Sequence, residues 1–391
     1  MISAERLPGR HTRRPVCAVL LIAIFLVLAA ALLSLAACGS SGSGATVSGA
    51  TTAASGSSTT SGGGTTASTS PPMTPSSGHH PDTTTAVAKL PKLTLVAPPG
   101  PMAIPLAYMV VNNKLADVAD KVDLVIWENA DQLKAIVAGG QGDFVTVPSN
   151  SSAIFYNKGL KLKLLDISVW NITYLVTRDA TAASFKDIKG QSLVVPFQGS
   201  VPDVMFQFIA KKDGLDPTKD FNLRYATDPT QAAQLLIAGQ VDNAVLSEAL
   251  STAALLQTKT AAKPLRKALA FDKAWAQAAG AGATSPIAGT VATASMLDKP
   301  EVIAVFQREY QAAVEWMLAN PDAAGQLVET KLPQLGLKAA VMTASLKSIT
   351  WKYTPAADAR PALEAFYTAL SELSPDVIGG KLPDDGFYYT P

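Results

Sequence analysis

Two segments of this chain share one pattern, and the repetition constrains the fold more than any other feature. Residues 131–153 read DQLKAIVAGGQGDFVTVPSNSSA, and residues 230–253 read TQAAQLLIAGQVDNAVLSEALSTA. Each segment predicts a helix, a glycine turn with Gln-x-Asp, a short buried strand and a serine-containing loop that opens another helix. Gln141 and Gln240 lie 99 positions apart. The repetition therefore predicts two similar α/β lobes, each offering one loop to a shared cleft.

The turn residues of this pattern indicate where a ligand would bind. Gly139 and Gly239 suit the left-handed backbone conformation that ends many helices. Residues 144–147 and 244–246 read as buried parallel strands. Ser149 and Ser247 follow just beyond them. Because an open α/β sheet binds ligands at the carboxyl ends of its strands, both serines are expected at the ligand edge.

Alternating strands and helices continue through the rest of the chain. Further predicted strands cover residues 93–97, 122–127, 162–169, 172–177, 192–196, 223–226 and 288–292, and predicted helices include 104–112, 202–213 and 301–318. Elements of this length in this order favour parallel sheets with helices on both faces.

Composition excludes several classes of function. Basic and acidic residues nearly balance, 32 against 31, which gives no electrostatic basis for binding nucleic acid. All three histidines and both cysteines precede residue 88. The rest of the chain therefore lacks the side chains for Ser-His-Asp or Cys-His catalysis and for His/Cys zinc sites. We expect no catalytic residue, no metal site and no cofactor.

The front of the chain has the organisation of an export signal and a tether. Four arginines precede an uncharged run over residues 16–37 that ends Leu-Ala-Ala-Cys. This ending resembles the lipobox of bacterial lipoproteins, which implies a signal peptide over 1–37 and lipidation of Cys38. A transmembrane anchor is the alternative. Residues 38–88, rich in Ser, Thr and Gly, are expected to form a disordered tether.

Four segments carry a resemblance to a known family. Residues 184–195 (SFKDIKGQSLVV), 238–246 (AGQVDNAVL), 300–324 (PEVIAVFQREYQAAVEWMLANPDAA) and 382–389 (LPDDGFYY) are similar to periplasmic solute-binding proteins of nitrate/sulfonate/taurine-type ABC transporters, a family that includes binding proteins for thiamine-pyrimidine precursors. The resemblance implies a two-lobed type II periplasmic-binding-protein fold, each lobe a mostly parallel sheet flanked by helices. Lobe 1 would comprise residues 89–180 and 288–391, and lobe 2 residues 181–287, with the two crossing strands near residues 172–177 and 288–292.

The same resemblance implies capture of a small-molecule solute between the lobes and its delivery to an ABC permease. The protein would be a monomer, anchored through Cys38 to the outer face of the cytoplasmic membrane or lying in the periplasm. The candidate ligand-binding residues follow predicted strand ends: Gly100, Pro101, Met102, Glu128, Asn129, Ser149, Asn150, Ser151, Trp170 and Asn171 in lobe 1, and Gln198, Gly199, Ser200, Ser247 and Glu248 in lobe 2.

Each candidate residue has a structural alternative. Serine and asparagine at helix starts would favour an anionic oxygen, but they are also common N-caps. Trp170 could stack on a planar ligand or pack within its lobe. Glu248 could pair with an amine or serve as a hinge or capping carboxylate.

None of these loops contains Lys or Arg, which favours a neutral, zwitterionic or singly charged organic molecule. Arg178 and Arg224 could still reach in from strand ends. Two other functions stay open: an enzyme on the same fold, and a sensor or adhesion lipoprotein that binds a protein partner.

Overall fold

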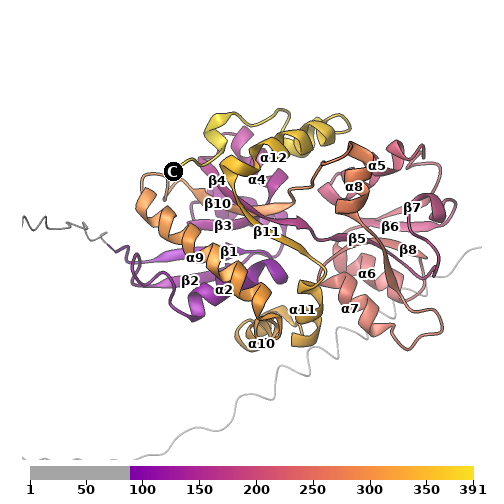
Figure 1. Cartoon of the computed structure of the whole chain (residues 1–391), viewed down its shortest axis with the longest axis horizontal. Helices are drawn as coiled ribbons and strands as arrows, with labels where there is room; N and C mark the ends of the chain where they lie inside the picture. Colours follow the sequence, from indigo (N-terminus) through magenta and orange to yellow (C-terminus); the bar gives the residue numbers. More distant parts are fainter. Residues whose placement is uncertain (1–88) are drawn as a thin grey trace, which may run out of the picture. The chain divides into compact units, whose positions relative to one another are not determined.

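The computed structural model describes residues 89–391, in which the strands form two separate sheets (Figure 1). The predicted signal peptide, Cys38 and the tether lie outside the described residues. The first sheet has the order β11-β4-β10-β3-β1-β2. Its strands are β1 (Leu93–Ala97), β2 (Val122–Ile126), β3 (Phe144–Pro148), β4 (Leu162–Asn171), β10 (Ala288–Thr293) and β11 (Thr350–Pro355).

The second sheet has the order β7-β6-β8-β5-β9. Its strands are β5 (Thr173–Thr177), β6 (Ser192–Pro196), β7 (Asn222–Ala226), β8 (Asn243–Ser247) and β9 (Arg266–Ala270). β1 pairs in parallel with β2 and β3, and β6 pairs in parallel with β7 and β8. β10 and β11 run against β4, and β5 runs against β8 and β9. We call the part around the first sheet lobe 1 and the part around the second sheet lobe 2.

Helices cover both faces of each sheet (Figure 1). In lobe 1, α4 (Ser149–Asn157) and α12 (Ala356–Ser371) lie on one side of the sheet, and α2 (Ile104–Val111), α9 (Pro300–Ala319), α10 (Pro321–Lys331) and α11 (Ala339–Leu346) lie on the other. α3 (Ala130–Ala138) packs its buried side chains into the same hydrophobic cluster as α4 and α12. In lobe 2, α5 (Val201–Lys212) and α8 (Phe271–Ala279) lie opposite α6 (Pro229–Ile237) and α7 (Leu250–Gln257).

Short 3-10 helices complete the described chain. They are η1 (Pro101–Ala103), η2 (Lys186–Ile188), η3 (Pro333–Leu335), η4 (Pro375–Ile378) and η5 (Asp385–Phe387). No described helix combines the length and the apolar character needed to span a membrane.

The predicted repetition is confirmed, with one correction. α3 and β3 recur 99 positions later as α6 and β8. The left-handed glycine of the first unit is Gly140, with a φ of 62°, and not Gly139, with a φ of −82°. Gly140 is the position that corresponds to Gly239, whose φ is 71°. The first unit contains two successive glycines, and the second of them makes the turn.

The chain crosses between the sheets near residues 172–177, where the first crossing strand is expected. β5 hydrogen-bonds to β8 and β9 in the second sheet, so it belongs to lobe 2 and not, as the expected boundary after residue 180 implies, to the first segment of lobe 1. The crossing therefore falls at Ile172, between β4 and β5. The chain returns to the first sheet with β10. At Gly289 in β10 an added Cβ would lie 1.8 Å from the Asp166 carbonyl oxygen, so only glycine fits there.

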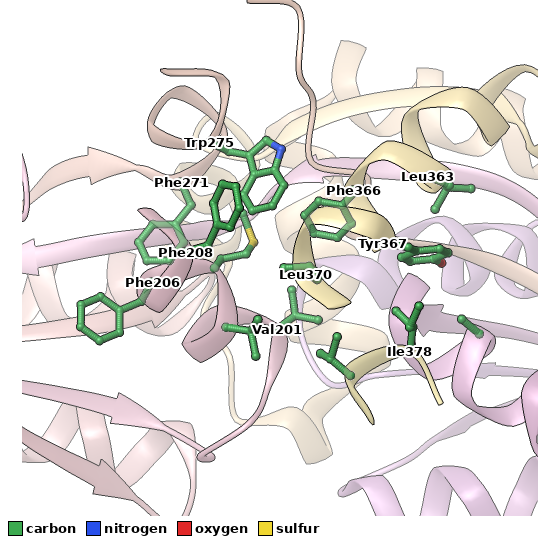
Figure 2. Packing of buried hydrophobic residues seen from close by; sticks show 14 of the residues in the cluster. Val201, Phe206, Phe208, Phe271, Trp275, Leu363, Phe366, Tyr367, Leu370 and Ile378 are labelled. Carbon is green, nitrogen blue, oxygen red and sulfur yellow. The ribbon is translucent and has the colours of Figure 1, made fainter. Parts of the chain in front are cut away.

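One hydrophobic cluster extends through both lobes (Figure 2). Trp275 of α8 stacks on Phe208 of α5, with ring centroids 4.7 Å apart. It also meets Phe366 of α12 edge to face at 4.9 Å. Because Phe366 belongs to lobe 1, these aromatic rings join the two lobes into one packed core.

Candidate functional site

The loops that follow β1, β2 and β3 meet at one edge of the first sheet, because these strands are parallel neighbours. Gly100, with a φ of 110°, makes the turn after β1, and it is buried together with Pro101. Met102 is half-buried. After β2, Glu128 and Asn129 are exposed. The backbone of this edge thus brings together three of the predicted ligand-binding loops.

Asn129 is an ordinary helix cap. Its side-chain oxygen accepts a hydrogen bond of 2.9 Å from the amide of Gln132, in the first turn of α3. The Gln132 side chain in turn accepts a hydrogen bond from the Glu128 amide at 2.6 Å. The Gln132 and Leu133 amides in the first turn of α3 are therefore satisfied within the chain.

The first turn of α4 differs from that of α3. Pro148 occupies its capping position and supplies no side-chain acceptor. Ser149 is buried, its hydroxyl donates to the Pro286 carbonyl at 2.6 Å, and its amide donates to the Ile287 carbonyl. The Asn150 side chain donates to the Val377 carbonyl at 3.2 Å. Ser149 and Asn150 therefore turn their side chains toward the protein, whereas the half-buried Ser151 makes no side-chain hydrogen bond in the described part of the chain.

In lobe 2 the loop between β6 and α5 has a strained backbone and exposed side chains. Phe197 has a φ of 53° and is 49% exposed, and Gly199 has a φ of 78°. A positive φ is unfavourable for phenylalanine, and such strain is often found at functional sites. Gln198 is exposed, and the Ser200 hydroxyl donates to the Pro196 carbonyl at 3.2 Å. α5 thus begins without a side-chain cap.

A buried carboxylate, Asp203, holds this loop in place. It accepts hydrogen bonds from the Gly199 amide at 2.8 Å, from the Gln207 side chain at 3.1 Å and from the Tyr225 hydroxyl at 3.1 Å. Burial and the neighbouring Asp203 raise the pKa of Tyr225 to about 12, so its hydroxyl stays protonated and donates. Asp203 therefore holds the loop between β6 and α5 in place.

The remaining candidates lie at the crossing between the lobes. The Trp170 indole donates to the Lys352 carbonyl at 2.9 Å, and the buried Asn171 donates to the Tyr174 hydroxyl at 3.1 Å. The Ser247 hydroxyl lies 3.1 Å from that of Thr173. Glu248, with a side chain that is 0% exposed, forms an ion pair with Lys267. These contacts favour a packing role for Trp170 and a hinge role for Glu248 over direct contact with a ligand.

Arg178 and Arg224, the two arginines near predicted strand ends, are not seen to reach the candidate loops. The Arg178 guanidinium donates to the carbonyls of Leu236 and Ile237 at the end of α6 and to that of Lys263, which precedes β9. Arg224 is exposed on β7, at the edge of the second sheet. Within residues 89–391 there is also no group of three or more His, Cys, Asp or Glu side chains placed to hold a metal ion.

A cavity of 440 Å³ lies elsewhere, between α5 and α8 of lobe 2 and α12 of lobe 1. Phe208, Trp275, Phe366 and several alanines line it, with Lys212 and Glu372 as its charged residues. None of the predicted ligand-binding residues contributes to its wall. The cavity is therefore separate from the loops at the sheet edges.

A family described as NMT1/THI5 like matches residues 119–324, which is more than half of the chain. The chain belongs to the NMT1/THI5 like family. The sequence has no match among curated proteins.

Solved structures share the fold of this NMT1/THI5 like protein. An ABC transporter protein from Parabacteroides distasonis has 23% identity and a TM-score of 0.66, over 77% of this chain and 99% of that one. The periplasmic aliphatic sulphonate-binding protein SsuA from Escherichia coli has 18% identity and a TM-score of 0.58, over 78% and 93%. The periplasmic nitrate-binding protein NrtA from Synechocystis PCC 6803 has 13% identity and a TM-score of 0.56, over 75% and 85%. The fold is therefore that of the type II periplasmic binding proteins.

Sequence reasoning missed three residues at these sites. Phe197 and Tyr225 are aromatic side chains near the carboxyl ends of β6 and β7 in lobe 2, 49% and 36% exposed. Both lie at or next to predicted strand ends, so a search for aromatic residues there would have found them. Lys267 could not have been found in this way, because its partner Glu248 is distant in sequence and β9 was not predicted.

Proposed function

We propose that this protein is the extracytoplasmic solute-binding component of an ABC importer and is not an enzyme. It would capture a small polar organic molecule between its lobes and present the closed form to a permease. Membership of the NMT1/THI5 like family and the shared fold with a sulphonate-binding and a nitrate-binding protein support this function. Binding would draw the two lobes together, because only the closed arrangement lets the solute contact both at once.

The observation that carries the proposal is the contrast between helix starts. α3 and α6 are capped by Asn129 and Asp228, whereas α4 in lobe 1 and α5 in lobe 2 have no side-chain cap. Both uncapped helices follow parallel strands at the expected ligand edges. In α4, whose first turn has no acidic residue, uncapped amides and the helix dipole favour a carboxylate, sulfonate or similar oxygen. The first turn of α5 contains Asp203, whose carboxylate offsets this preference, so the start of α5 would contact a neutral or cationic part of the same solute.

The charge of the candidate loops limits the class of solute. They contain no Lys or Arg, and Arg178 is engaged by backbone carbonyls. A dianion would usually be met by a bidentate arginine. We therefore propose a neutral, zwitterionic or singly charged organic solute, such as a sulfonate resembling taurine or a thiamine-pyrimidine precursor.

A thermal-shift screen of the purified protein tests this function. The panel would contain taurine, alkanesulfonates, nitrate, thiamine, its pyrimidine precursor and amino acids. A ligand at about one hundred times its dissociation constant should stabilise the fold by about 2.7 kcal/mol, a rise of several degrees in Tm. A taurine-like sulfonate or a pyrimidine precursor is expected to give such a shift, and nitrate a smaller one.

Two variants then locate the solute. Ser151→Ala and Gln198→Ala each remove one polar group from opposite lobes, and neither side chain is hydrogen-bonded to the described protein. Each is expected to raise Kd about three- to tenfold, the effect of one hydrogen bond. Gln240→Ala, at an exposed residue outside the candidate loops, is the control. Unchanged Kd in both variants would place the solute outside the cleft.

We also propose that the protein is a monomer held at the membrane through a lipid on Cys38. The Leu-Ala-Ala-Cys sequence and the preceding apolar run support this anchor. Fractionation of cells that express the full chain tests it. The parent should be recovered with membranes, and Cys38→Ser should lose the lipid that holds it there. Equal detergent-phase partitioning of both proteins would contradict lipidation at Cys38.

A further inference from the structure

A buried ion pair in lobe 2 lies next to Ser348, between α11 and β11 of lobe 1. Glu248 follows β8, Lys267 lies on β9, and their side chains are 0% and 15% exposed. The Lys267 ammonium also donates to the Thr252 hydroxyl at 3.0 Å and lies 4.7 Å from the centre of the Tyr174 ring. All of these partners belong to lobe 2.

The third hydrogen bond of this ammonium crosses to lobe 1. Lys267 Nζ donates to the Ser348 hydroxyl at 2.8 Å, and the Tyr174 hydroxyl donates to the Ser348 carbonyl. Ser348 lies between α11 and β11, and β11 belongs to the first sheet. A lysine ammonium has three donors, and here they bind Glu248, Thr252 and Ser348. Only the last of these bonds joins the lobes.

The surroundings of Glu248 make the hydrogen bond between Lys267 and Ser348 sensitive to the relative position of the two lobes. Its second carboxylate oxygen, Oε2, is buried and has no partner, and the same holds for the hydroxyl of nearby Ser251. A carboxylate in such a place depends on its single counter-charge, because a buried charge without a partner is strongly unfavourable. Separation of the lobes at this point would break the hydrogen bond between Lys267 and Ser348 and expose the ion pair to water.

We propose that Lys267, held in place by Glu248, is a positioning residue that fixes the arrangement of the two lobes through Ser348. By setting this arrangement it would set the solute affinity of the cleft, a consequence that rests on the proposed function. Neither Lys267 nor Ser348 would touch the solute, since neither belongs to the loops at the sheet edges.

Distance measurement between spin labels tests the proposal without any solute. The full chain would carry Cys17→Ser and Cys38→Ser, so that labels attach only to Lys134→Cys in α3 of lobe 1 and Gln234→Cys in α6 of lobe 2, both exposed positions. Against this background, Lys267→Met should add a second population of interlobe distances. The added change Glu248→Gln should remove that population, because no buried charge is then left unpaired.

The variant Ser348→Ala distinguishes a role of Lys267 in positioning the lobes from a role in folding. It leaves the ion pair and the hydrogen bond from Tyr174 to the residue 348 carbonyl intact and removes only the hydroxyl that Lys267 binds, so it should broaden the distance distribution with a smaller fall in Tm than Lys267→Met. The Kd of any solute found by the thermal-shift screen should rise by roughly tenfold, the weight of one hydrogen bond to a charged group. Lys189→Met, which breaks an exposed pair with Asp220 inside lobe 2, is the control and should change neither distances nor Kd.

Two outcomes overturn the proposal. The first is a lower Tm for Lys267→Met with distances equal to those of the parent, since the pair would then only stabilise lobe 2. The second is normal solute binding and an unchanged distance distribution in Ser348→Ala. Failure of the solute screen alone, with distances that respond as expected, would count against the proposed function and leave the role of Lys267 supported.

Discussion

At the scale of single residues, Asp166 stands out as a buried carboxylate with no positively charged partner among the described residues. It lies in β4 at the centre of lobe 1 and is 0% exposed. The Thr290 hydroxyl donates to one of its oxygens, and the other oxygen, Oδ1, has no partner. The nearby Ser168 and Tyr310 hydroxyls lie 3.1 Å apart, and no described cation pairs with Asp166. Burial raises the pKa of Asp166 to about 7, well above its ordinary value of 3.8.

This shift predicts a loss of stability as the pH rises. Between about pH 4 and pH 7 the unfolded chain has lost this proton, whereas the folded protein still holds it. The free energy of unfolding should therefore fall by about 1.4 kcal/mol per pH unit in this window, about 4 kcal/mol in total, and then level off. In Asp166→Asn this contribution disappears, because asparagine does not titrate.

Urea unfolding at several pH values between 4 and 8 measures the effect as the difference between parent and variant. This difference removes the opposite contribution of exposed carboxylates such as Asp187, whose pKa is lowered by hydrogen bonds from Ala183 and Ser184. Asp117→Asn, at an exposed position, is the control. Parallel pH curves for the parent and Asp166→Asn would mean that Asp166 is ionised in the folded protein.

At the scale of elements, the repeated unit explains why so much of the fold could be predicted. The capping arrangement of α3 recurs in α6, where the Gln231 amide donates to Asp228 at 2.8 Å and the Gln231 side chain accepts from the Thr227 amide at 2.8 Å. Such contacts lie within four residues, so the local sequence encodes them. All strands predicted from apolar runs are confirmed to within two residues at either end.

Two edge strands were missed, and their sequences explain why. β9 reads RKALA and β11 reads TWKYTP. Each lies at the end of its sheet and is only partly buried, so neither contains a run of apolar residues. Their positions depend on pairing with β5 and β4, which are distant in sequence. Local pattern therefore predicts central strands better than edge strands.

For the candidate site, the sequence predicts which loops lie at the sheet edges but not the direction of their side chains. Parallel strand order places the correct backbone segments at the sheet edges, but side-chain direction depends on distant partners. Ser149 turns toward Pro286 because that carbonyl lies 2.6 Å from its hydroxyl. Glu248 turns toward Lys267 on β9. Neither partner belongs to the repeated unit, so the repetition could not reveal these contacts.

At the scale of the whole molecule, the lobes touch on both faces of the sheets. On one face Ser348, which follows α11, binds Lys267. On the other, Phe366 of α12 meets Trp275 of α8, and the aromatic cluster around them extends through both lobes (Figure 2). Phe366 and Trp275 are each 1% exposed. A core shared in this way should make the two lobes unfold together.

Removing the ring of Phe366 tests this coupling. Phe366→Ala should lower the free energy of unfolding by about 3–5 kcal/mol, the cost of a large cavity in a core. Because Trp275 loses its lobe 1 partner, hydrogen exchange should become faster in α8 of lobe 2 as well as in α12. Leu318→Ala, at a side chain that is 43% exposed on α9, should change stability by less than about 0.5 kcal/mol. If α8 keeps its protection while α12 loses it, the lobes have separate cores, and polar contacts between them, such as Lys267 with Ser348 and Thr350 with Asp272, are more important for their arrangement.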